Sequence, residues 1–226
     1  MPVIKALANC YCAAGRAKEA ISLLRNFTNN HPQDTDVRLT LAAWQAWFGK
    51  TNGYETTRRQ FVQWAARNTD ASPAQAAVKA YCLEPSTNAA LLAQALSIAQ
   101  RGVEFRKGTS LQTWYQLSLG MVQYRMGDYA DAENSLSVAA QNAGQYQDVP
   151  PTAAFFRAMS LFQQGHKDEA RQLFAQAEAQ MTPYPQDPSK PVIAGQAASH
   201  DVIVSWLAYR EAKALLYDSE TTASGR

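Results

Sequence analysis

The stretch LGMVQYRMGDYADAENSLSVA, residues 119–139, decides the fold once it is set beside RAMSLFQQGHKDEARQLFAQA, residues 157–177. Small and bulky residues of the same kind recur between the two stretches at a constant spacing of 38 positions. The pairs at this spacing are Gly127 and Gly165, Ala132 and Ala170, Leu136 and Phe174, and Ala139 and Ala177. A fixed period of this size indicates an internal repeat, whose unit is a helix, a glycine-containing turn and a second helix.

The chemistry of this unit explains why its copies must stack. Glycine lets the first helix end in a left-handed conformation, and alanine lets two helix backbones approach closely. A single hairpin cannot bury its apolar face alone, so neighbouring hairpins have to cover it. The sequence therefore predicts an all-α solenoid in which short helix pairs lean on the next pair along the chain.

Capping and turn residues divide most of the chain into five expected hairpins. Asp34 predicts the start of the second unit, and Asn52-Gly53 predicts its turn. Pro85 ends the first helix of the third unit, because a residue ahead of proline resists the helical conformation. Thr109 opens a capping box that predicts the start of the fourth unit. The expected units cover about 1–33, 34–70, 72–108, 109–146 and 150–181.

The C-terminal part departs from the repeat. Four prolines and a glycine within residues 182–198 predict a loop rather than a helix. A last helix is expected over residues 201–217. It belongs to a segment, residues 199–217, that is expected to cover the open end of the stack. Residues 218–226 are small and polar and predict a frayed tail.

Composition and charge exclude several classes of function. The net charge of +2 argues against a nucleic-acid partner, and no apolar run is long enough to span a membrane. The N-terminus lacks the features of an export signal, so a cytoplasmic location is expected. Cys10, Cys12 and Cys82 form no CxxC pair and are expected to be buried thiols in a reducing compartment.

No residue pattern predicts catalysis, a cofactor or a metal site. The three histidines, His31, His166 and His200, lie far apart and have no partner at ligand spacing within their own helices. Each is expected to be a solvated residue at a helix end or turn. GxSxG and HExxH motifs are absent from the sequence as well.

Residues of the kinds that define the repeat also occur at the start of the chain, where their pattern is similar to that of a known family. They are Leu7, Ala8, Tyr11, Gly15, Ala20, Leu24 and Pro32. The pattern resembles the tetratricopeptide repeat, which has a period of about 34 residues. This resemblance implies a right-handed α-solenoid of about five hairpins plus a capping helix, which binds a protein or peptide without catalysis or cofactor.

Longer sequence segments are similar to the C-terminal repeat region of certain large bacterial serine/threonine protein kinases. They are AWQAWF at 43–48, AYCLEP at 80–85, WYQLSLG at 114–120, FRAMSLF at 156–162, and His200-Asp201 followed by WLAYREAKALL at 206–216. The similarity implies that the chain is part of such a protein or a relative of one. The chain itself is not expected to be a kinase, because it lacks the Gly-rich loop, the HRD motif and the DFG motif.

Lys5 and Asn9 form one candidate binding site. The resemblance places them where tetratricopeptide domains that clamp a C-terminal carboxylate carry Lys and Asn. A cation and an amide on one helical face would hold a carboxylate through charge-assisted hydrogen bonds. The clamp should continue with Asn in the second unit, but Ala43 stands there, which favours a chance match.

Aromatic residues of the later units form a second candidate. Trp114, Tyr124, Phe155 and Phe162 are expected in first helices, with Arg125 beside them. Core packing is the simpler interpretation, whereas the functional one is an inner groove that anchors a peptide. The expected function is a protein-interaction scaffold that recruits substrates or regulators or self-associates through this groove or the 182–198 loop. The alternative is a carbohydrate- or small-molecule-binding protein that stacks its ligand on the same rings.

Overall fold

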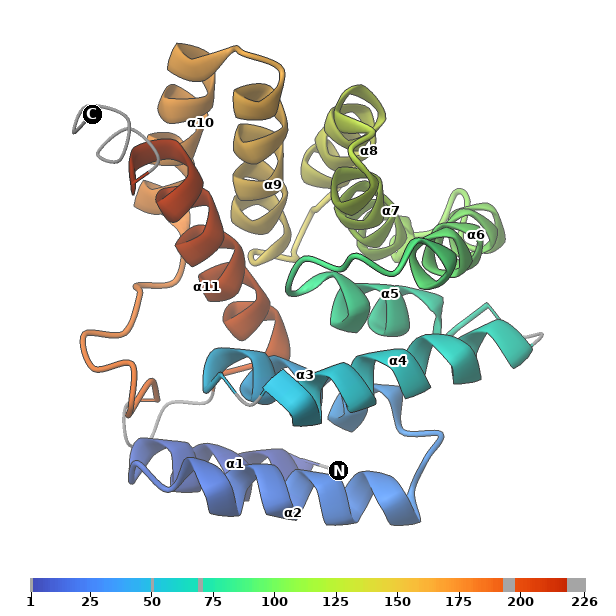
Figure 1. Cartoon of the computed structure of the whole chain (residues 1–226), viewed down its shortest axis with the longest axis vertical. Coiled ribbons are helices and arrows are strands. Elements are labelled where there is room, and N and C mark those ends of the chain that lie inside the picture. Colours follow the sequence, from blue (N-terminus) through green and yellow to red (C-terminus); the bar gives the residue numbers. More distant parts are fainter. Residues whose placement is uncertain (1, 50, 69–70, 193–197, 219–226) are drawn as a thin grey trace.

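The computed structural model describes residues 2–49, 51–68, 71–192 and 198–218, which form eleven α-helices, one π-helical turn and no strand. The predicted fold class, an all-α helical-repeat solenoid, is confirmed (Figure 1). The elements are α1 (Pro2–Ala13), α2 (Ala17–Asn30), α3 (Thr35–Trp47), α4 (Thr51–Arg67), α5 (Ala74–Cys82), α6 (Ala89–Phe105), α7 (Gln112–Met126), α8 (Tyr129–Gln141), α9 (Val149–Gln163), α10 (Lys167–Gln180), α11 (His200–Lys213) and the π-helical turn η1 (Ala214–Asp218).

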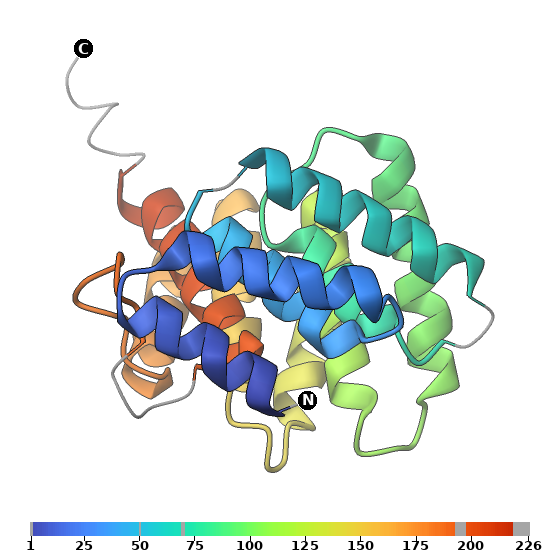
Figure 2. The same ribbon diagram turned by 90° about the horizontal axis from the view of Figure 1, so that it is seen from below.

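The hairpins stack through two kinds of contact. The second helix of one pair packs on the first helix of the next, as α2 on α3, α4 on α5, α6 on α7 and α8 on α9. First helices also pack on each other, as α3 on α5, α5 on α7 and α7 on α9. The first pair joins the array mainly through α2, and Figure 2 shows α1 and α2 lying side by side.

The repeated small and bulky residues form the closest helix contacts. Ala132, Leu136 and Ala139 are fully buried on α8 where it faces α7. Gly120 of α7 lies so close that a Cβ atom there would come within 2.4 Å of Leu136 Cγ. The helix backbones approach this closely because only glycine and alanine leave room for them.

A left-handed glycine follows the first helix of every hairpin except the third, where α5 ends at Cys82 without one. Gly127 and Gly165 follow α7 and α9 with φ values of +87° and +89°, which are left-handed. In the second unit the turn was predicted at Asn52-Gly53, and this is wrong. Gly49, with a φ of +65°, makes the turn, and Gly53 lies in the first turn of α4. Only Phe48 separates Gly49 from α3, so the left-handed residue comes before Asn52 and α4 starts earlier than expected.

Other helix boundaries follow local chemistry with small differences. The Asp34 carboxylate accepts a hydrogen bond from the Val37 amide and starts α3. The expected start at Thr109 is wrong, because α7 begins at Gln112 and the Gln112 side chain accepts from the Gly108 amide instead. The C-terminal helix is regular only to Lys213 and then widens into η1.

Helix α11 reaches further than an end cap would. It packs on α9 and also on α3, so it crosses back toward the second hairpin (Figure 1). Trp206 of α11 lies 5.5 Å from Trp47 of α3 between ring centres. The Pro-rich segment supports this crossing, because Thr182 O and Pro188 O accept hydrogen bonds from the indole N–H groups of Trp206 and Trp47. Residues 193–197 of the expected loop and 219–226 of the expected tail lie outside the described residues.

The close approach of α7 and α8 gives a prediction. Ala132→Leu should lower the free energy of unfolding by about 1–3 kcal/mol, because a larger side chain overpacks a fully buried position. Ala130→Leu on the same helix is the control and should change it by less than about 0.5 kcal/mol, because Ala130 is exposed. Urea denaturation measures both values. Equal effects of the two substitutions would show that the repeat register is wrong.

Candidate functional site

The candidate site is the inner face of the repeat array, where first helices of the hairpins meet α11. Helices α3 and α9 pack on α11 directly, and side chains from α5 and α7 reach it as well. Seven apolar residues of α11 are at most 7% exposed: Ile203, Val204, Trp206, Leu207, Ala208, Tyr209 and Ala212. The inner face therefore already holds a helix, which the chain itself supplies.

Lys79 of α5 anchors the N-terminal end of α11. Its side chain is 1% exposed, and its Nζ lies 2.7 Å from Asp201 Oδ1 and 4.3 Å from the centre of the Trp114 ring. Burial raises the pKa of Asp201, but the charges of Lys79 and His200 outweigh burial and hold it well below its usual range. A buried ion pair and a cation–π contact thus fix the first turn of α11.

His200 links the same turn to the second hairpin. Its Nε2 lies 3.2 Å from Asp201 Oδ2, and its Nδ1 lies 3.1 Å from Asp36 Oδ1 of α3. Asp36 also forms an ion pair with Lys5 of α1. Burial lowers the pKa of His200, but the two carboxylates outweigh burial and raise it above its ordinary value. Alternating charges therefore connect α1, α3, α11 and α5.

Arg125 of α7 anchors the C-terminal end of α11. Its side chain is 3% exposed, and its two terminal nitrogens face the two carboxylate oxygens of Glu211, with Nη2 2.6 Å from Oε2. Its Nε donates a 2.9 Å hydrogen bond to Cys82 O at the end of α5. One planar guanidinium therefore joins α5, α7 and α11 in a fixed geometry.

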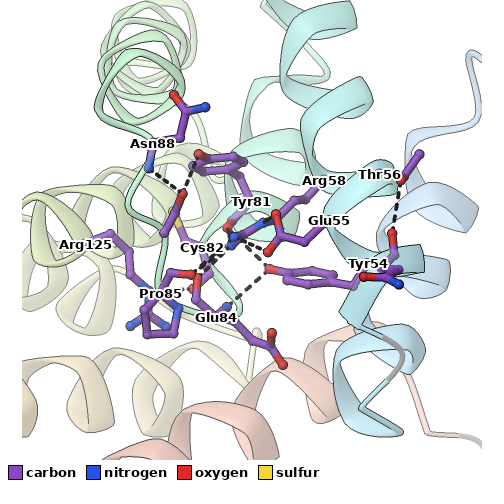
Figure 3. Close-up of polar contacts among 12 residues, drawn as sticks. Tyr54, Glu55, Thr56, Arg58, Tyr81, Cys82, Glu84, Pro85, Asn88 and Arg125 are labelled. Atoms are coloured by element: carbon purple, nitrogen blue, oxygen red, sulfur yellow. Dashed lines mark hydrogen bonds and ion pairs between the residues drawn. The ribbon is translucent and has the colours of Figure 1, made fainter.

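Helix α5 ends inside the molecule, and its terminal carbonyl groups need donors. Arg58 of α4, whose side chain is 4% exposed, donates to Tyr81 O, Glu84 O and Pro85 O at 3.0–3.3 Å. The Tyr54 hydroxyl donates to Ala80 O at 2.9 Å. Figure 3 shows Tyr54 and Arg58 converging on the chain from Tyr81 to Pro85, with Arg125 on the other side. The two arginines replace the water that an exposed helix end would bind.

The predicted clamp residues lie beside this network. Lys5 pairs with Asp36, and the Asn9 amide donates a 3.1 Å hydrogen bond to Ala198 O, just ahead of α11. Both side chains are thus engaged by the chain itself. Their role toward a carboxylate of a partner stays a prediction.

The predicted groove aromatics differ in burial, with two rings buried and two half-buried. Phe155 is fully buried, and its ring centre lies 5.6 Å from that of Tyr209 on α11. Tyr124 is 9% exposed and meets the edge of Phe156. Trp114 and Phe162 are half-buried. The structure brings Trp114, Arg125 and Phe155 to α11 or to its anchors, whereas Phe162 lies under Lys167.

Apart from Arg125, sequence reasoning missed the charged residues that hold α11. His200 was expected to be solvated, and this is wrong, because its side chain is only 14% exposed between two carboxylates. Lys79 stands in the apolar run AAVKAYC, and a lone cation in such a run was a usable signal of a buried ion pair. The partners Asp201 and Glu211 carried no local signal.

Metal binding and thiol chemistry are the other kinds of site relevant to the described residues. They contain no group of three or more His, Cys, Asp or Glu side chains placed to hold a metal ion. Burial raises the pKa of both Cys12 and Cys82 to about 12, so neither thiol is activated as a nucleophile. Cys10 is exposed, contrary to expectation. No helix in the described part of the chain is long and apolar enough to cross a membrane.

The fold and site define an all-α helical-repeat protein whose inner face holds a helix. Comparison with protein families gave two matches to the tetratricopeptide repeat, over residues 6–34 and 117–188. These segments are similar to that repeat and support the tetratricopeptide repeat superfamily. Neither curated proteins nor solved structures gave a match. Repeats of this kind suggest a protein–protein interaction scaffold, and helical-repeat folds of this class are typically non-catalytic.

The position of His200 predicts a pH dependence of stability. Its pKa is higher in the folded chain than in the unfolded one, so its contribution is complete below the unfolded pKa of about 6.5 and is lost as the pH rises through the folded pKa. His200→Gln should therefore cost more stability at pH 5.5 than at pH 9. His166→Gln, at an exposed turn, is the control and should cost little at either pH. Urea denaturation at both pH values measures this, and an equal cost of His200→Gln at both would contradict it.

Proposed function

We propose that the chain is a non-catalytic protein-interaction scaffold whose inner face binds an amphipathic helix of a partner, with α11 as the resident occupant. The observation that carries this proposal is the way the inner face holds α11, and we call this part of the inner face the helix seat. A row of apolar residues lies between an acidic residue at one end, Asp201, and another at the other end, Glu211, each paired with a buried cation. Helix-in-groove binding uses this combination of apolar anchors and flanking charges.

The setting we propose is a bacterial serine/threonine kinase or a relative of one, in which the repeats recruit substrates or regulators or drive self-association. Five sequence segments between residues 43 and 216 are similar to the repeat region of such kinases, and this similarity supports the setting. A cytoplasmic location accompanies it. The chain contributes binding rather than phosphoryl transfer, because its sequence has no phosphate loop, catalytic base or metal-binding motif of a kinase.

Burial of the aromatic residues favours protein binding over the carbohydrate alternative. A sugar platform needs several rings exposed on one surface. Trp44, Trp47 and Trp206 are at most 5% exposed, and Phe155 is fully buried. These rings serve the core and the seat of α11.

A peptide with the sequence of residues 199–217 tests the helix seat. Glu211→Gln in the full chain leaves Arg125 without its carboxylate and should loosen α11, so we expect the labelled peptide to bind this variant at least about tenfold more tightly than wild type. Fluorescence anisotropy measures the affinity.

Two controls define the result. Glu104→Gln removes an equally charged but exposed side chain and should leave peptide binding as in wild type. A peptide with Gln in place of Glu211 should bind the loosened chain more weakly. If neither peptide binds, or both bind equally, the helix seat is not a binding site for a partner.

A further inference from the structure

A second surface, separate from the seat of α11, lies between the first two hairpins. Helices α2 and α4 leave a cleft there, made of two adjoining pockets of about 700 and 370 Å³. Both pockets are lined by Arg25 of α2 and Gly53 of α4, so they adjoin at these two residues. No residue of α11 lines it.

The charge of this cleft is of one sign. Lys18, Arg25 and Arg38 line it, and no Asp or Glu does among the described residues. Neither Arg25 nor Arg38 forms an ion pair within the part of the chain that the structure describes. Such a one-sided set of cations attracts an anionic group and rejects a cationic one.

Arg38 is held in place without a counter-ion. Its guanidinium lies 4.8 Å from the centre of the Phe61 ring and 5.2 Å from that of Trp64, and it donates a 3.1 Å hydrogen bond to Pro32 O. Burial holds the pKa of Arg38 below its usual range. A half-buried cation without a carboxylate is electrostatically uncompensated, so an anion beside it gains more than at an exposed arginine.

A second uncompensated polar group lies behind Gly53, which lines the cleft. The Gln45 side chain of α3 is fully buried, and neither atom of its amide has a hydrogen-bond partner among the described residues. It lies against Gly53, where a Cβ atom would come within 3.1 Å of Gln45 Nε2 and 3.4 Å of Arg25 Nη2. Glycine at position 53 thus leaves the space between the amide and the guanidinium open.

We propose that the α2–α4 cleft binds an acidic peptide segment in an extended conformation, with one carboxylate seated between Arg25 and Arg38. The lining residues of α2 run from Lys18 to Asn29, a length of about 16 Å, which matches about five residues of extended chain. The hydroxyl and amide side chains of Thr57 and Gln60 on the α4 wall suit the polar backbone of a peptide. This proposal does not depend on the helix seat at α11.

Labelled hexaglutamate added to the full chain tests the cleft, with labelled hexaglutamine as the uncharged probe. We expect hexaglutamate to bind and hexaglutamine not to bind. Arg25→Gln should weaken hexaglutamate binding by about tenfold, which corresponds to roughly 1.4 kcal/mol. Arg25 is exposed, so this variant should fold as wild type does. Arg38→Gln should weaken binding further, and a thermal melt checks that it is folded.

Arg101→Gln is the matched control, because it removes the same charge from an exposed position on α6 outside the cleft. It should change hexaglutamate affinity by less than about twofold. Equal weakening by Arg25→Gln and Arg101→Gln would overturn the proposal, since binding would then follow net charge alone. Displacement of hexaglutamate by sodium phosphate, where sodium chloride of equal ionic strength has no effect, would also overturn it and indicate a site for inorganic anions.

Discussion

The interaction on which the structure depends is the paired anchoring of α11 by two buried cations. Lys79 binds Asp201 at one end of the helix, and Arg125 binds Glu211 at the other. A buried cation without its partner is strongly unfavourable, so each anchor specifies where α11 must lie even though the pair adds little net stability over an apolar contact. The apolar stripe between the anchors supplies the main stabilisation, because it is removed from water along its length.

The same two cations depend on α5, which is short and ends inside the molecule. Lys79 projects from α5, and Arg125 donates to the carbonyl of its last residue, Cys82. Arg58 donates to the carbonyls of Tyr81 and Glu84 on either side of Cys82, so the end of α5 is held from the α4 and α7 sides at once. The third hairpin is therefore the structural centre of the inner face.

Local sequence predicted the helices well but could not predict the crossing of α11. Gly127 and Gly165 occupy the same position of the repeat, and each ends the first helix of its hairpin. Pro85 acts only on the residues beside it, so periodicity and turn chemistry were sufficient to predict these helix ends. Asp201 meets a lysine 122 positions away, and Glu211 meets an arginine 86 positions away. Nothing in the local pattern distinguishes these acids from solvated ones. For the same reason the groove residues Arg125 and Phe155 were identified while their occupant was not.

The central claim is that α11 is an integral occupant of the inner face. Native-state hydrogen exchange of its backbone amides tests this most directly, because exchange reports the free energy of local opening. The account predicts that the amides of residues 204–212 are protected as strongly as those in the middle of α3 and α9. Exchange of these amides at the rate of an unstructured peptide, while α3 and α9 stay protected, would contradict it.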